Sequence, residues 1–73
     1  MKANDTVKFI MSSKGITQET LMKSLGVKSQ SGISQTLNRD MRISSLVRFL
    51  SAMSCEVVIK DKDSGLEYTV DDG

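Results

Sequence analysis

The chain has 73 residues, of which 38% are hydrophobic and 26% charged, with a formal net charge of +1. These values allow one small globular domain and exclude a chain too polar to fold. One cysteine and no histidine are present, so we expect no internal disulfide, no metal site, no cofactor and no enzymatic activity.

The expected location follows from what the sequence lacks. No apolar run approaches the roughly 20 residues that span a bilayer, and the first five residues do not begin the apolar stretch of a signal peptide. We therefore expect a reduced, cytoplasmic protein with no membrane contact. No small-molecule ligand is indicated, so a macromolecular partner is the default expectation.

Charge is unevenly distributed along the chain. Residues 1–55 carry eight Lys or Arg and three Asp or Glu, a charge of +5, whereas residues 56–73 carry two and six, a charge of −4. A basic body favours a polyanion such as nucleic acid as its partner, although a small chain can acquire such a split by chance. Because a single core is marginal at this size, a partner or a second copy of the chain is expected.

The first predicted helix begins near Asn4 or Asp5, either of which is a favourable N-cap residue. Gly15 ends it, because glycine readily takes the left-handed conformation just past a helix. The apolar stripe of this helix has the spacing i, i+3, i+4 and consists of Val7, Ile10 and Met11.

Two short helices joined by a glycine-containing turn are predicted next. Thr17 is a favourable N-cap for the first of them, and Gly26 ends it after about two turns. The stretch 28–31 supplies a turn and a new cap for the second, which extends to about Asn38. The inward positions of this pair are apolar: Leu21, Met22, Leu25, Ile33 and Leu37.

A fourth helix is predicted from Ile43 to Met53, where the helical period is clearest. Its apolar stripe consists of Ile43, Leu46, Val47, Leu50 and Met53, widened by Phe49. Alternation typical of strands then begins, and residues 56–60 and 66–70 are predicted to form a hairpin around a turn at 61–65. Residues 71–73 are expected to be frayed.

The predicted fold is mainly α with a small β element: four short helices followed by a C-terminal β-hairpin. Residues 1–55 form the helical domain, and residues 56–73 form the hairpin and tail. A lone two-stranded hairpin is marginal in water, so we expect it to pack on the helices or to pair with another strand. We predict a dimer interface there, formed by Val58, Leu66, Tyr68 and Val70.

The two short helices have the features of a helix-turn-helix, in which the second helix enters the major groove of DNA. The chain resembles the lambda-repressor-like, or Cro/C1-type (XRE), helix-turn-helix family at Lys14-Gly15-Ile16-Thr17-Gln18-Glu19, Leu25-Gly26-Val27 and Gln30-Ser31-Gly32-Ile33. The resemblance covers residues 5–53 and rests on the order and spacing of these segments. The chain departs from the family pattern in three ways: one additional residue between Val27 and Ile33, Met22 in place of the usual alanine, and a hairpin after the fourth helix.

The exposed face of the third helix carries side chains that hydrogen-bond base edges or phosphates: Gln30, Ser31, Ser34, Gln35 and Asn38. The resemblance implies that Gln18 contacts a phosphate and braces Gln30, and that Asn38 contacts a second phosphate. It also implies base contacts by Gln30, Ser31 and Gln35, and dimerisation through C-terminal strands. We assign Ser34 to the same base-reading face. The cations that flank this helix are further candidate phosphate contacts: Lys28, Arg39 and Arg42.

Two classes of function remain open at this point. The first is sequence-specific binding of double-stranded DNA by a homodimeric transcriptional repressor, on a palindromic operator with half-sites roughly 34 Å apart. The second is a protein-interaction module, antitoxin-like or an accessory regulator, that uses the hairpin edge or the acidic tail. Ordinary surface polarity explains the glutamines and serines without any ligand, and a solvated face explains the arginines.

Overall fold

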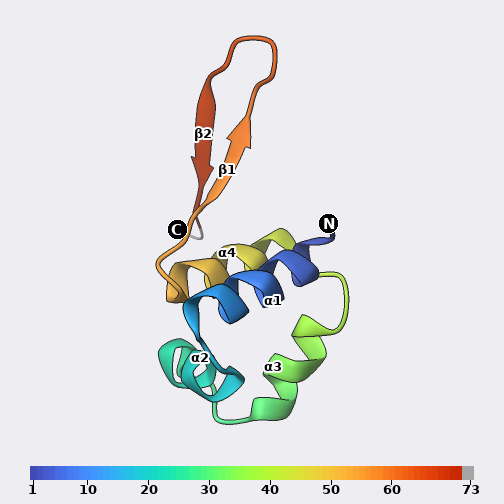
Figure 1. Ribbon diagram of the computed structural model, residues 1–73, viewed down its shortest axis with the longest axis vertical. Coiled ribbons are helices and arrows are strands. Elements are labelled where there is room, and N and C mark those ends of the chain that lie inside the picture. The colour runs from blue at the N-terminus through green and yellow to red at the C-terminus, as the bar shows by residue number, and fades with distance from the viewer. Residues whose placement is uncertain (72–73) are drawn as a thin grey trace.

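The computed structural model describes residues 1–71 and confirms the predicted fold class: four helices and a two-stranded antiparallel sheet. The elements are α1 (Ala3–Lys14), α2 (Gln18–Leu25), α3 (Gln30–Leu37), α4 (Ile43–Ala52), β1 (Val57–Lys60) and β2 (Glu67–Val70). The helices form a body in which α2 and α3 lie on one side of α1 and α4, and the hairpin projects from the other side (Figure 1). Within the described residues, no helix is both long and apolar enough to cross a membrane.

Three of the four helices end in the same way. A left-handed residue follows α1, α2 and α4: Gly15 (φ 67°) and Gly26 (φ 69°) directly follow their helices, and Ser54 (φ 61°) follows α4 after Met53. In each case the next amide bonds back to a carbonyl five residues earlier: Ile16 to Met11 (2.8 Å), Val27 to Met22 (3.1 Å) and Cys55 to Leu50 (2.8 Å). This arrangement satisfies carbonyls at the helix ends and turns the next apolar side chain toward the core.

The predicted start of the first helix is wrong. The helix begins at Ala3, Lys2 is its N-cap residue without a side-chain cap bond, and both Asn4 and Asp5 lie inside the first turn. Asn4 is buried, and its Nδ2 donates to the carbonyl of Leu37 at 3.1 Å. Because Asn4 lies on the inward face of α1, this long-range bond replaces the local capping bond that its side chain favours.

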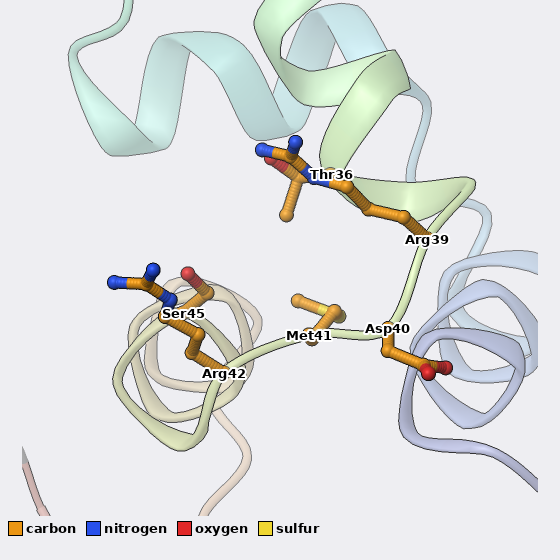
Figure 2. A pocket seen from close by; sticks show the side chains of 6 residues that line it. All are labelled: Thr36, Arg39, Asp40, Met41, Arg42 and Ser45. Atoms are coloured by element: carbon orange, nitrogen blue, oxygen red, sulfur yellow. The ribbon is translucent and has the colours of Figure 1, made fainter.

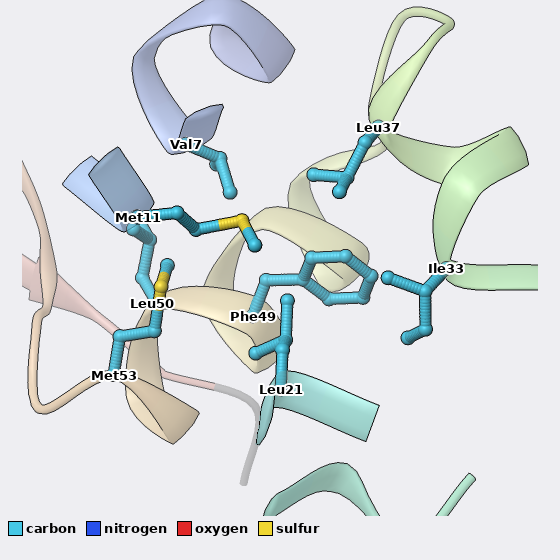
Figure 3. Packing of buried hydrophobic residues seen from close by; sticks show 8 residues of the cluster. All are labelled: Val7, Met11, Leu21, Ile33, Leu37, Phe49, Leu50 and Met53. Carbon is cyan, nitrogen blue, oxygen red and sulfur yellow. The ribbon is translucent and has the colours of Figure 1, made fainter. Parts of the chain in front are cut away.

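The core lies between the four helices. The Phe49 ring points into the middle of a cluster to which every helix contributes (Figure 3). The cluster consists of Val7, Met11, Leu21, Ile33, Leu37, Phe49, Leu50 and Met53. One predicted member differs: Ile43 is 57% exposed, because α4 begins there and its packing against the core starts at Leu46.

The hairpin contacts the body at its base, where Val57 packs against the core cluster. Its register pairs Val57 with Val70, Val58 with Thr69, Ile59 with Tyr68 and Lys60 with Glu67. Away from the base its side chains are exposed, and the molecule is elongated, with a longest dimension of 42 Å. Of the predicted frayed end, residues 72–73 lie outside the described residues.

The hairpin turn is closed by hydrogen bonds from its own polar groups. The amide of Asp63 donates to Oδ1 of Asp61 at 2.9 Å, and the amide of Gly65 donates to the carbonyl of Asp61 at 2.8 Å. The Asp63 amide, followed by the hydroxyl and amide of Ser64, lowers the pKa of the Asp61 carboxyl below its ordinary value.

Candidate nucleic-acid interface

The α2–turn–α3 unit is positioned by a cap, a glycine turn and a buried seam. The Thr17 hydroxyl accepts a hydrogen bond from the amide of Thr20 at 3.1 Å, which confirms Thr17 as the N-cap of α2. Gly26 ends α2 in the left-handed conformation, and the turn continues to Ser29, the N-cap residue of α3. The seam between the two helices is buried at Leu21, Ile33 and Leu37. These contacts fix the side of α3 that faces solvent.

The solvent-facing side of α3 carries two glutamine amides. Gln30 and Gln35 are exposed, and neither side chain has a hydrogen-bond partner among residues 1–71. Both amides can therefore present a donor and an acceptor to a ligand, as bidentate recognition of an adenine edge requires. The hydroxyl of Ser31, also exposed, lies 2.7 Å from that of Ser29. Ser34 is half-buried, and its hydroxyl lies 3.4 Å from Nδ2 of Asn38.

The brace that the family resemblance implies between Gln18 and Gln30 is absent. Gln18 is half-buried at the start of α2, and no hydrogen bond joins the two side chains in the described part of the chain. The turn between the two helices contains one residue more than the family pattern.

The C-terminal end of α3 is held by α1 through two polar side chains, an arrangement that sequence reasoning missed. In addition to the bond from Asn4 to Leu37, Nζ of Lys8 donates to Oδ1 of Asn38 at 2.9 Å. Nδ2 of Asn38 also donates to the carbonyl of Ser34 at 2.9 Å. The Asn38 side chain is therefore engaged within the protein, and a phosphate contact by Asn38 requires that Lys8 be displaced or share it. The spacing of Asn4, three residues before Val7, was the available signal that it faces inward.

Two arginines line a pocket of about 280 Å³ between the end of α3 and the start of α4. Its lining residues are Thr36, Arg39, Asp40, Met41, Arg42 and Ser45. The guanidinium groups of Arg39 and Arg42 extend to the same side of the pocket, whereas the Asp40 carboxylate points away from them (Figure 2). Neither arginine forms an ion pair with any residue from 1 to 71. Two guanidinium groups without an ion-pair partner in the described part of the chain suit an oxyanion such as a phosphate.

The remaining predicted site residues are Lys28, next to α3, and the dimer-interface residues of the hairpin. Lys28 is exposed in the turn before α3, so it lies on the same unit as the glutamines. The predicted interface residues of the hairpin do not share a face: the register places Val58 on the side opposite Tyr68 and Val70, while Ile59 pairs directly with Tyr68. Sequence reasoning missed Ile59, although the strand alternation that identified Tyr68 and Val70 indicates it once the register is known.

Other kinds of site find little support in the structure. No group of three or more His, Cys, Asp or Glu side chains among residues 1–71 is arranged to hold a metal ion. Cys55 is half-buried, and its Sγ lies 3.6 Å from the carbonyl oxygen of Met53. Comparison of the chain with family models, with curated proteins and with solved structures gave no match. The chemistry of the α2–turn–α3 unit and its surroundings is therefore the basis for inferring what this chain does.

Proposed function

We propose that this chain is a sequence-specific, double-stranded DNA-binding regulator that acts in the cytoplasm as a homodimeric repressor on a palindromic operator. The observation that carries the proposal is a combination at α3: two glutamine amides without a hydrogen-bond partner, and flanking cations without an ion-pair partner, among residues 1–71. Gln30 and Gln35 offer base-edge hydrogen bonds, and Lys28, Arg39 and Arg42 flank them. Ser31 and Ser34 are additional base contacts in this proposal, and Gln18 and Asn38 additional phosphate contacts.

The charge distribution supports the same orientation. The helical segment, residues 1–55, has a charge of +5, and the hairpin and tail, residues 56–73, have −4. The hairpin leaves the body on the side opposite α2 and α3 (Figure 1). A polyanion is attracted to the body and repelled by the hairpin, so DNA binds along α3 with the hairpin directed away from it. Repression follows if the bound dimer covers a promoter.

A second candidate is the protein-interaction module, and the exposed hairpin favours it. Ile59, Leu66 and Tyr68 are each more than half exposed, and such apolar side chains in one place are a common mark of a protein-binding surface. This candidate requires no DNA contact by α3. The two proposals therefore differ in whether α3 binds DNA, and both allow the hairpin to bind a protein.

Salt-dependent binding to duplex DNA separates the two candidates. Fluorescence anisotropy of a labelled mixed-sequence duplex, titrated with the protein at several salt concentrations, should show binding at low salt that weakens steeply as salt rises. The matched control is Ser51→Ala, an exposed position on α4, which should bind like the parent protein. Absence of any binding at low salt contradicts the DNA-binding proposal and leaves the interaction module.

A further inference from the structure

The C-terminal end of α3 is fixed differently from the ends of the other helices. Asn38, the residue that follows α3, has φ of −103°, and none of residues 38–42 is left-handed. The amide of Asn38 bonds the carbonyls of Ser34 (3.1 Å) and Gln35 (3.2 Å), which satisfies part of the last turn from within the helix. The last carbonyl of α3, that of Leu37, instead receives its hydrogen bond from another helix.

Asn4 of α1 supplies that bond. Its Nδ2 donates to the Leu37 carbonyl at 3.1 Å, and the residue is only 8% exposed. Oδ1 of the same amide is buried and has no hydrogen-bond partner among residues 1–71. A buried acceptor without a partner makes an amide contribute less to stability than a fully paired one. The bond to Leu37 thus satisfies a carbonyl of α3 while one polar atom of Asn4 itself stays unpaired.

The bond from Asn4 constrains α3 in a way that the apolar core does not. Ile33 and Leu37 anchor α3 to the body with exposures of 2% and 1%. Apolar contacts are non-directional, so they allow the end of a helix to tilt or shift slightly. A hydrogen bond is directional and weakens steeply as its angle departs from linearity. The bond to the last residue of α3 therefore sets where that end of the helix lies.

A second side chain of α1 reaches the same end of α3. Nζ of Lys8 donates to Oδ1 of Asn38 at 2.9 Å. Because Lys8 and Asn4 are four residues apart, they lie on one face of α1, and that face holds the end of α3. The bond from Lys8 is exposed, whereas the bond from Asn4 is buried, and a hydrogen bond is stronger where water does not compete for it.

The two base-reading glutamines lie at different distances from the contact with Asn4. Gln35 is two residues before Leu37 in the last turn of α3, and its carbonyl accepts from the amide of Asn38. Gln30 is the first residue of α3, about 10 Å from Leu37 along the axis at roughly 1.5 Å per residue. A tilt of the helix end, or fraying of its last turn, therefore displaces Gln35 more than Gln30.

We propose that Asn4 is a positioning residue for sequence reading: by holding the Leu37 carbonyl, it aligns Gln35 with the base that Gln35 contacts. This inference rests on the DNA-binding function proposed above. A glutamine amide reads an adenine edge through two hydrogen bonds at once, and such a site requires neighbouring groups that hold its side chains to within about 0.5 Å. Asn4 is buried and acts through the backbone of α3.

The first test requires no DNA. Amide hydrogen exchange is compared between the parent protein and Asn4→Leu, which keeps the branching of the side chain and removes the donor. Exchange at Leu37 should accelerate about fivefold relative to Leu21 in α2, as the loss of one hydrogen bond predicts. The matched control is Met53→Val, a core change beside the hairpin base, which should leave this ratio of rates unchanged. Asn4→Ala, which needs no additional space, serves if the leucine variant does not fold.

The second test measures sequence discrimination on duplexes that the parent protein selects from a random library. The base pairs that Gln35 and Gln30 read are located first, as those at which Gln35→Ala and Gln30→Ala lose discrimination. Asn4→Leu should lower discrimination about tenfold at the Gln35 base pair, which is within the range of one bidentate contact. It should leave the Gln30 base pair unchanged, and Met53→Val should leave both unchanged.

Three results overturn the inference. Equal losses of discrimination at the two base pairs show a general loss of folding rather than positioning. Unchanged discrimination at the Gln35 base pair shows that Asn4 does not align Gln35, and an unchanged ratio of exchange rates refutes the hold of Asn4 on the end of α3. If no duplex binds while exchange accelerates at Leu37 alone, the contact between the helices stands, and its role in base reading fails together with the proposed function.

Discussion

Replacing both Arg39 and Arg42 with glutamine tests whether the pocket between α3 and α4 holds DNA phosphate. Each phosphate contact contributes about 0.9 to the slope of log affinity against log salt. Loss of two contacts therefore reduces the magnitude of that slope by about 1.8. Between 50 and 200 mM the salt concentration rises fourfold. Four raised to the power 1.8 is about 12, so the ratio of parent affinity to variant affinity should fall about 12-fold over this range.

The structure indicates that this double variant retains its fold. Both arginines are exposed, neither has an ion-pair partner within residues 1–71, and Arg42 makes no side-chain cap bond to α4. Surface substitutions of this type change the free energy of unfolding by about 0.5 kcal/mol or less. Thermal unfolding followed by circular dichroism verifies this before DNA affinity is compared.

Anisotropy titrations on one selected duplex, at salt concentrations from about 50 to about 400 mM, supply the slopes, because log affinity falls linearly with log salt. The matched control is the Lys60→Gln, Lys62→Gln double variant, which removes the same two charges from the hairpin. An unchanged slope in the arginine variant refutes the phosphate assignment. An equal reduction in both variants shows that only net charge matters and refutes the pocket as a specific contact.

Three further predictions concern stability. Changing Leu37, which is 1% exposed in the core, to alanine should lower the free energy of unfolding by about 2–5 kcal/mol, measured by urea unfolding. A smaller loss contradicts the packing described. Ser54→Gly should raise the free energy of unfolding by about 0.5–1 kcal/mol, because Ser54 has a left-handed φ of 61° that glycine adopts without strain; a lower melting temperature refutes this. The pKa of the Asp61 carboxyl is lowered in the folded chain. The stabilisation that this carboxylate contributes is therefore complete above about pH 4 and is lost as the pH falls through the folded pKa. An unchanged Asp63 amide signal in an NMR titration to low pH contradicts the hydrogen bond from that amide to the Asp61 carboxylate.

The sequence predicted well where local signals agreed with each other. Thr17, Gly15 and Gly26 mark helix ends through backbone preferences that depend on a few neighbouring residues, and the structure confirms all three. The helical spacing of apolar residues located α3 and α4, and their alternation located the hairpin, for the same reason. Ile43 shows the limit of this reasoning, because periodicity does not reveal where along a helix the packing begins.

The features that sequence reasoning missed depend on contacts between distant segments. Asn4 has the chemistry of a cap residue, but a carbonyl 33 positions away determines its place in the fold. The bond from Lys8 to Asn38 and the pocket between Arg39 and Arg42 likewise exist only once the helices are assembled. The hairpin register was not predicted either, since only the pairing of the two strands shows that Ile59 shares a face with Tyr68.

If the exposed face of α3 reads DNA sequence, selection of bound duplexes from a random library should reveal it. The parent protein should enrich a recurrent half-site, arranged as an inverted repeat with a spacing of about one helical turn. The Gln30→Ala, Gln35→Ala variant should lose about 1–3 kcal/mol of discrimination for each base contact removed, while it unfolds at the parent temperature. Enrichment of the same sequences by both proteins, or of none by the parent protein, would show that Gln30 and Gln35 do not read DNA sequence.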